Sequence, residues 1–274
     1  MIKKKGKYTL EYQEKPNNLK LRFFKLPVLD RYRQDPRYKI NEYPVSMSLS
    51  IKDEFYEDPT IPESDKIGIQ SLGYAYRKKD NSQVIVTYLP YLARLPQDHQ
   101  NYWASFEEED ECILDEDFFN QEFNAEFTER VNIFDAFIQE LIEINKLCKL
   151  MNEPDFFCNT YEKNKPVNFC WISKPTYQCY YELVHLIDKL VSENINKDFF
   201  KDKIELQEEV SQTNNKIKVV DKGTIRLLKE WLDAKLKFPD PKPKDDMLNM
   251  FKKIRKERQK PAHSITDNTY DTHY

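Results

Sequence analysis

Glycine is scarce in this chain of 274 residues, which has four, at positions 6, 68, 73 and 223. Phosphate-binding loops of the P-loop and Rossmann types need several glycines within a short span, where the backbone approaches the phosphates closely. Glycines so far apart cannot form such a loop. We therefore exclude both classes of nucleotide-binding protein.

Long apolar runs and paired cysteines are also missing. No apolar run is long enough to span a bilayer, and the basic residues 1–7 are not followed by the apolar stretch of a secretory signal. The cysteines are odd in number, scattered and without a Cys-x2-Cys pair; they are Cys112, Cys148, Cys158, Cys170 and Cys179. We expect reduced thiols, no metal or other cofactor, no membrane association and a cytoplasmic location.

One metal site stays open as an alternative. Cys158, Cys170, Cys179 and His185 are the residue types that bind zinc, although their spacing matches no familiar zinc knuckle. Measuring the metal content of the purified protein would show whether these four residues bind zinc.

The chain has enough apolar residues to form hydrophobic cores and enough charged residues to cover a solvent-exposed surface. Hydrophobic residues make up 39%, aromatic residues 14% and charged residues 33%, and the mean hydropathy is −0.81. The net charge of −4 neither requires nor excludes nucleic acid as a partner, because local clustering of basic residues matters more than the total.

The first part of the chain has the alternating pattern of strands. We expect strands over residues 7–12, 45–51, 66–70, 72–76 and 83–89. The polar residues 78–82 favour a hairpin between the last two strands. Residues 90–106 are expected to form a short helical connector rich in aromatics, followed by a solvated acidic run at 107–111. Residues 1–112 are therefore predicted to be a small antiparallel β-rich domain.

From about residue 113 the apolar residues recur with the period of a helix. The stripes predict a long amphipathic helix from about 127 to 152, and further helices near 180–191, 199–204 and 224–236, the last with Thr224 as its N-cap. Residues 113–274 are therefore predicted to form a helical bundle. The fold class expected for the whole chain is α+β, with the β-rich domain first.

A final helix is predicted to begin at Asp245 or Asp246, either of which can cap it. Its buried face is expected to comprise Met247, Met250, Phe251 and Ile254. Continuing that stripe leads to Arg258, which would point toward the interior or a cleft. Pro261 ends the helix, so His263 lies just beyond the break.

Arg258 and His263 suit the cleavage of RNA without a metal. An imidazole can move a proton at the attacking or leaving oxygen, and a guanidinium stabilises the charge on the phosphoryl oxygens. The nearby basic residues could hold a phosphate backbone; they are Lys252, Lys253, Arg255, Lys256 and Lys260. The spacing alone is weak evidence, and a basic C-terminal helix is also commonly a solvated face.

The segment 254–263, followed by Asp267, Asn268, Tyr270 and Asp271, resembles the end of HEPN domains, the higher eukaryotes and prokaryotes nucleotide-binding helical bundles. Their Arg-x4-6-His motif marks many toxin, anti-phage and CRISPR-linked ribonucleases. The resemblance implies that Arg258 and His263 are the catalytic pair and Gln259 an auxiliary. It also implies a homodimer in which two motifs complete one site. HEPN bundles usually continue with a long helix after the histidine, whereas 11 residues remain here, so an incomplete bundle is also compatible.

The expected function is that of a metal-independent endoribonuclease effector of a bacterial toxin or anti-phage defence system. The expected partners are RNA, a second copy of the chain, and a regulatory or antitoxin protein. The β-rich half would regulate or target the enzyme, as a sensor or partner-binding domain. The alternative is a non-catalytic HEPN-like subunit that binds a partner or nucleic acid in a defence or toxin–antitoxin complex.

Overall fold

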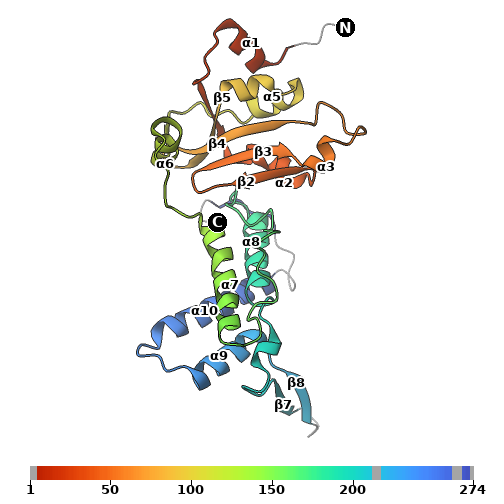
Figure 1. Cartoon of the computed structure of the whole chain (residues 1–274), viewed down its shortest axis with the longest axis vertical. Helices are drawn as coiled ribbons and strands as arrows, with labels where there is room; N and C mark the ends of the chain where they lie inside the picture. Colours follow the sequence, from red (N-terminus) through yellow and green to blue (C-terminus); the bar gives the residue numbers. More distant parts are fainter. Residues whose placement is uncertain (1–4, 212–216, 261–266, 272–274) are drawn as a thin grey trace. The chain divides into compact units, whose positions relative to one another are not determined.

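The computed structural model describes residues 5–211, 217–260 and 267–271. The fold is mixed α+β, as expected, and the chain forms two compact units, residues 1–133 and 134–274 (Figure 1). The division lies after Ile133, where the sequence predicted a boundary between 112 and 113. The reason is that residues 112–114 add a strand to the sheet of the first unit and the following residues pack on that sheet.

The N-terminal unit contains an antiparallel sheet of six strands with the order β1-β5-β4-β3-β2. The short β6 pairs with the end of β4, beyond the part of β4 that pairs with β3. The strands are β1 (Leu21–Lys25), β2 (Tyr38–Glu42), β3 (Ser46–Ile51), β4 (Gly68–Arg77), β5 (Gln83–Tyr88) and β6 (Cys112–Leu114).

Short helices precede, connect and follow these strands. They are α1 (Lys7–Glu14), η1 (Leu26–Leu29), α2 (Asp30–Gln34), α3 (Asp53–Tyr56), α4 (Leu89–Arg94), α5 (Gln97–Ala104), α6 (Glu116–Phe119) and the π-helical turn η2 (Asn120–Asn124). The expected hairpin across residues 78–82 and the helical connector after β5 are confirmed. The strands predicted over 66–70 and 72–76 form the single strand β4, while β1, β2 and β6 were not predicted.

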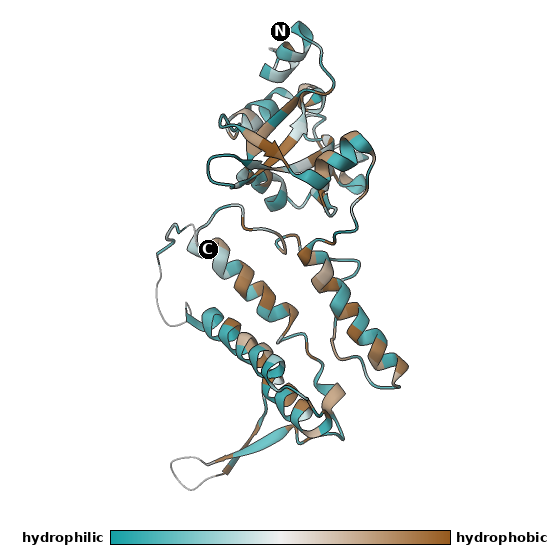
Figure 2. Cartoon of the chain, turned by 90° about the vertical axis from the view of Figure 1, so that its left-hand side faces the viewer, coloured by the Kyte–Doolittle hydropathy of each residue, from teal (hydrophilic) through white to brown (hydrophobic). Residues whose placement is uncertain are grey.

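The main core of this unit lies on one face of the sheet, under α1, α4 and α5. It includes Phe24, Leu72, Ile85 and Trp103, each with no exposed surface. Figure 2 shows the apolar character of the strands that supply this core. The other face has a smaller cluster around Phe118 of α6. The Phe118 ring lies 2.4 Å from where a Cβ would stand on Gly73, so the strand needs glycine there.

The predicted strand at residues 7–12 is wrong, because this segment forms the helix α1. Its first backbone N–H groups are capped from elsewhere in the chain: Oε1 of the buried Gln100 accepts from Tyr8 N at 2.9 Å and from Thr9 N at 3.1 Å. The buried Tyr8 packs in the core, and Glu11 pairs with Lys20 and Arg22. These contacts favour a helix over the alternating pattern.

The acidic run at 107–111 is only partly solvated. The side chains of Glu107 and Glu108 are 15% and 5% exposed. Glu107 pairs with Lys7 and Arg22, and Glu108 pairs with Arg77. The beginning of this run therefore helps to hold α1 and β1 together, which corrects the expectation of a fully solvated segment.

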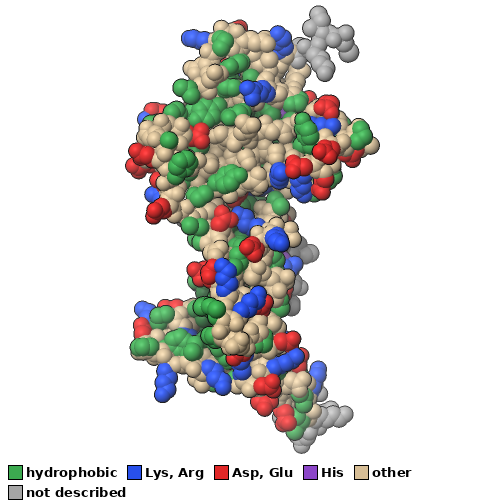
Figure 3. Space-filling model, viewed as in Figure 1, with side chains coloured by type: hydrophobic (Ala, Val, Ile, Leu, Met, Phe, Trp, Pro, Cys, Tyr) green, Lys and Arg blue, Asp and Glu red, His purple; other side chains and the backbone are tan. Residues whose placement is uncertain are grey.

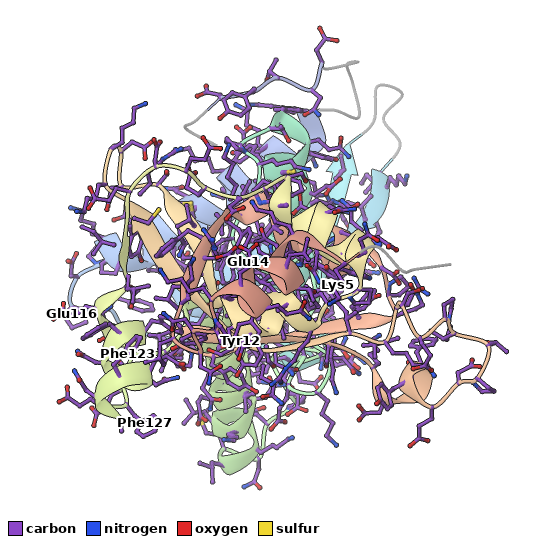
Figure 4. The ribbon with its side chains drawn as sticks, turned by 90° about the horizontal axis from the view of Figure 1, so that it is seen from above. Lys5, Tyr12, Glu14, Glu116, Phe123 and Phe127 are labelled. Carbon is purple, nitrogen blue, oxygen red and sulfur yellow. The ribbon has the colours of Figure 1, made fainter. Side chains whose placement is uncertain are left out.

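The C-terminal unit is mainly helical. Its elements are α7 (Ile133–Leu150), α8 (Tyr177–Leu190), η3 (Lys197–Phe200), β7 (Gln207–Ser211), β8 (Ile217–Asp221), α9 (Thr224–Lys235) and α10 (Lys242–Gln259). α7 begins later than predicted, and Phe127 is 79% exposed instead of belonging to its buried face (Figure 4). The antiparallel hairpin β7–β8 was not predicted.

The core of this unit joins all four long helices through residues such as Leu141, Leu190, Leu228 and Leu248. Thr224 is the first residue of α9 and not its N-cap, because its hydroxyl donates to the Ser192 carbonyl. Within the described ranges, no helix combines the length and the apolar composition needed to cross a membrane.

α10 begins at Lys242, earlier than the predicted Asp245 or Asp246. Pro243 stands in the first turn, where a missing backbone N–H costs nothing. The buried face is also displaced from the prediction: Leu248 is buried, whereas Met247 and Met250 are 37% and 53% exposed. Phe251 and Ile254 are half-buried, as the stripe required.

Candidate functional site

Arg258 lies in the last turn of α10 and is held by two carboxylates. Its Nη1 lies 2.6 Å from Oδ2 of Asp188 and also donates to Oε1 of Glu193. Asp188 has no exposed surface, whereas the side chains of Glu193 and Arg258 are 41% and 24% exposed. Arg258 therefore points toward the interior of its unit, as the helical stripe predicted.

The spacing of residues on α8 explains this contact. Tyr181, His185 and Asp188 follow one another at intervals of four and three, so they share one face of the helix. That face packs against α10. The Tyr181 hydroxyl donates to the backbone carbonyl of Arg258 at 3.2 Å, so contacts with Arg258 occur both before and after His185 along α8.

A ladder of rings runs along the same helix. The rings of Tyr177 and Tyr181 are stacked with centroids 6.3 Å apart, and those of Tyr181 and His185 are stacked with centroids 6.1 Å apart. The interplanar angles are 16° and 21°. The stacking sets the plane of the His185 imidazole, which lies one helical turn before Asp188.

The charges at this cluster reinforce one another. Hydrogen bonding to Glu193, followed by the charge of Asp188, raises the pKa of Arg258, which stays a cation at every physiological pH. The hydrogen bond from Arg258 lowers the pKa of Glu193 in turn. A buried carboxylate such as Asp188 is costly unless it is paired, so Arg258 has a structural role as well as any chemical one.

Two polar atoms of the cluster are enclosed without a hydrogen-bond partner. They are Nδ1 of His185 and the second carboxylate oxygen of Asp188, Oδ1. Such atoms typically cost about 1–3 kcal/mol each when they stay unpaired in a protein interior. Two such atoms one helical turn apart are unusual in a helix whose role is only structural, because buried polar atoms normally have hydrogen-bond partners.

The predicted basic residues lie mostly on the solvent side of α10. Lys252, Lys253, Lys256 and Lys260 are exposed, and Lys260 pairs with Glu257. Arg255 differs, because it is half-buried beside Gly223. Basic and acidic side chains are interspersed on the face of the molecule that Figure 3 presents.

The remaining predicted site residues are Gln259 and His263. Gln259 is the last residue of α10 and is exposed, away from the carboxylates that hold Arg258. His263 lies outside the described residues, so the expected convergence of Arg258 and His263 stays a prediction.

After the undescribed stretch the chain lies against the start of α8. The Tyr177 amide donates to the Thr269 carbonyl at 2.8 Å, and the Gln178 amide donates to Oδ1 of Asn268 at 3.0 Å. Asn268 therefore helps to cap the helix that also carries His185 and Asp188. The chain thus contacts α8 on both sides of residues 261–266, through Arg258 before them and Asn268 after them.

Sequence reasoning missed Asp188 and Glu193, and considered His185 only as a zinc ligand. A signal for Asp188 was available: it is an acidic residue within the apolar stripe of α8, between Ile187 and Leu190. In the part of the chain that is described, no three potential metal ligands come together. Cys158 is exposed, Cys170 is buried, and neither joins His185 in a group of ligands.

Comparison with protein-family models, with curated protein sequences and with solved structures finds no significant match. The geometry around Arg258 is therefore the basis for assigning a function.

Proposed function

We propose that this protein is a metal-independent endoribonuclease of the HEPN type, with Arg258 and His263 as its catalytic pair. The observation that supports the proposal most is the fixing of Arg258 by the buried Asp188 at the end of a basic helix. Both carboxylates contact a single guanidinium nitrogen, Nη1. This leaves Nη2 and Nε without a hydrogen bond to the described residues, and they can serve as donors to a phosphate.

In the proposed reaction the ribose 2′-OH attacks the adjacent phosphate. His263 acts as an acid or base, and Arg258 stabilises the charge that develops on the phosphoryl oxygens. Gln259 would assist at the same phosphate. The RNA backbone would lie along the exposed basic side of α10, near Lys252, Lys253 and Lys256, with Arg255 and Lys260 beside them.

The biological setting that fits such an enzyme is a bacterial toxin or anti-phage defence system in the cytoplasm. A homodimer would bring two motifs together, and the β-rich N-terminal unit would regulate the enzyme or bind a regulatory or antitoxin protein. These assignments follow from the resemblance of residues 254–263 to HEPN domains.

A second function is favoured by one observation. The charge of Arg258 is already balanced by Asp188 and Glu193 in this structure. An arginine engaged in this way can simply fasten α10 to α8, and the basic helix would then bind RNA or a partner without cutting it.

RNA cleavage in the presence of EDTA separates the two functions. Arg258→Lys and His263→Ala should each reduce cleavage roughly 100- to 10,000-fold, and the products should carry 2′,3′-cyclic phosphates. The matched control is Lys235→Ala, an exposed basic residue at the end of α9. Circular dichroism and thermal melting of each variant show that the fold persists.

Cleavage that survives both substitutions would remove the motif from the mechanism. RNA that is bound with a steep salt dependence but left intact by the unaltered protein would favour the second function.

A further inference from the structure

The cleavage reaction just proposed moves two protons, and this inference rests on that proposed function. One proton leaves the attacking 2′-oxygen while another is gained by the leaving 5′-oxygen, at opposite ends of the reacting phosphate. A single imidazole is poorly placed to serve both ends. A second acid or base beside Arg258 would serve the other end.

His185 is the residue in that position. Its two neighbours on the same face of α8 both contact Arg258, Tyr181 through its hydroxyl and Asp188 through its carboxylate. His185 lies between them on this face, and its ring is stacked on that of Tyr181. Imidazole is the side chain best suited to exchange a proton near neutral pH.

The two unpartnered atoms indicate how the imidazole would be oriented. Nδ1 of His185 and Oδ1 of Asp188 are enclosed, one turn apart, and neither has a hydrogen-bond partner. They do not bond to each other in this structure. An imidazole N–H and a carboxylate oxygen are complementary, so a hydrogen bond between these two side chains would satisfy both atoms. Oδ2 of Asp188 would still hold Arg258.

We propose that His185 is the general base of the reaction and that Asp188 is its positioning residue. Asp188 keeps the proton on Nδ1, so that Nε2 has a free lone pair toward the substrate. Nε2 takes the proton of the 2′-OH as the bond from O2′ to phosphorus forms. The bond from phosphorus to O5′ breaks, and O5′ receives a proton from water. The products are a 2′,3′-cyclic phosphate and a 5′-hydroxyl.

This assignment places a base, its positioning carboxylate and the phosphate-binding arginine in one chain. Arg258, His185 and Asp188 come together within residues 134–274, so the base does not depend on a second copy. Glu193, which is 41% exposed, would hold Arg258 from the solvent side.

The first test is cleavage of RNA by His185→Gln in EDTA. We expect a loss of roughly 100-fold or more, with the melting temperature close to that of the unaltered protein. The matched control is Glu182→Gln, an exposed position on the same helix that should leave cleavage unchanged. Cleavage by His185→Gln at the rate of the unaltered protein would overturn this inference and leave the proposed function standing. An unaltered protein that does not cleave RNA would overturn both.

The second test does not depend on activity or on the folding of a variant at His185. In the full-length chain labelled with ¹⁵N, the nitrogen shifts of the four histidines report which ring nitrogen carries the proton. We expect the proton of His185 on Nδ1 in the unaltered protein, and a share of molecules with the proton on Nε2 in Asp188→Asn. A proton on Nε2 in the unaltered protein would overturn the proposed dyad.

Discussion

His99 is enclosed in the core of the N-terminal unit, where it has no exposed surface. Trp103 Nε1 donates to the Tyr32 hydroxyl oxygen at 2.9 Å, and this hydroxyl lies 2.9 Å from Nδ1 of His99. Because an indole can only donate, the Tyr32 oxygen accepts from Trp103, which leaves the Tyr32 proton free to point to Nδ1 of His99. Burial favours the neutral imidazole, whose Nδ1 can accept that proton.

This arrangement predicts that the N-terminal unit loses stability in acid. Burial, followed by the charge of Arg31, lowers the pKa of His99 below its ordinary value of 6.5. The unfolded chain therefore binds a proton more tightly than the folded chain, and the free energy of unfolding falls as the pH drops below about 6.5. One such group contributes at most about 1.4 kcal/mol per pH unit.

Denaturant unfolding at pH 7.5 and 5.5, followed by Trp103 resonances in the full-length chain, measures the effect. His99→Asn should unfold more readily at pH 7.5 but lose less stability on going to pH 5.5. An equal loss in both proteins would show that other groups cause the acid sensitivity.

At the scale of single elements, α1 depends on a residue far from it in sequence. The Gln100 amide accepts from two N–H groups of α1 and also donates to Thr9 Oγ1 and the Leu95 carbonyl, both at 2.7 Å. A Cβ on Gly6 would lie 2.3 Å from Oε1 of Gln100, so glycine is required for this approach.

Gly6→Ala and Gln100→Leu should therefore both destabilise the N-terminal unit, each by roughly 1–3 kcal/mol. In Gly6→Ala the amide must move and lose bonds, and in Gln100→Leu the helix N–H groups lose their acceptor. Amide hydrogen exchange of residues 8–12 in the full-length chain measures the effect. Exposed Lys15→Ala is the control, and slow exchange that persists in Gly6→Ala would contradict the assigned contact.

This cap also explains why residues 7–12 were predicted to be a strand. Lys-Tyr-Thr-Leu-Glu-Tyr alternates, and the helix signals that a sequence can show locally, a capping side chain and first-turn acids, are missing. The decisive acceptor comes from another helix, so no local pattern contains it. By contrast, the sequences of β3, β4 and β5 are apolar or alternating segments between turn residues, which is why local patterns found them.

The same distinction applies to the candidate site. Arg258 continues a helical stripe, so its inward direction could be predicted from spacing alone. Its partners Asp188 and Glu193 are 70 and 65 residues away in sequence, and nothing local links them to it. Met247 was assigned to the buried face because it is apolar, but it is 37% exposed and the neighbouring Leu248 is the residue that enters the core.

At the scale of the whole molecule, each unit has its own hydrophobic core, and the N-terminal unit has a smaller second cluster on the other face of its sheet. Between η2 and α7, residues 125–132 form no helix or strand, and Glu126 and Glu129 are exposed. The proposed chemistry lies entirely in the second unit, and the first unit is available for a regulatory role.

Limited digestion with a Glu-specific protease should therefore cut first after Glu126 or Glu129. Two resistant fragments that correspond to the two units are expected because each keeps its own core. Mass spectrometry identifies the first cut, and circular dichroism of the separated fragments shows whether they stay folded. A first cut inside β3, β4 or α8 would contradict the assigned boundary.

The cap on α1 has a consequence for the order of folding during synthesis. An isolated helix of eight residues is not stable in water, and its acceptor, Gln100, is 92 residues from Tyr8. α1 leaves the ribosome before its acceptor and must therefore wait until α5 has emerged before it can pack onto the sheet. Although α1 is synthesised before the strands, it is expected to be among the last parts of its unit to form. Interactions around Gly6 should therefore affect the rate of unfolding more than the rate of folding.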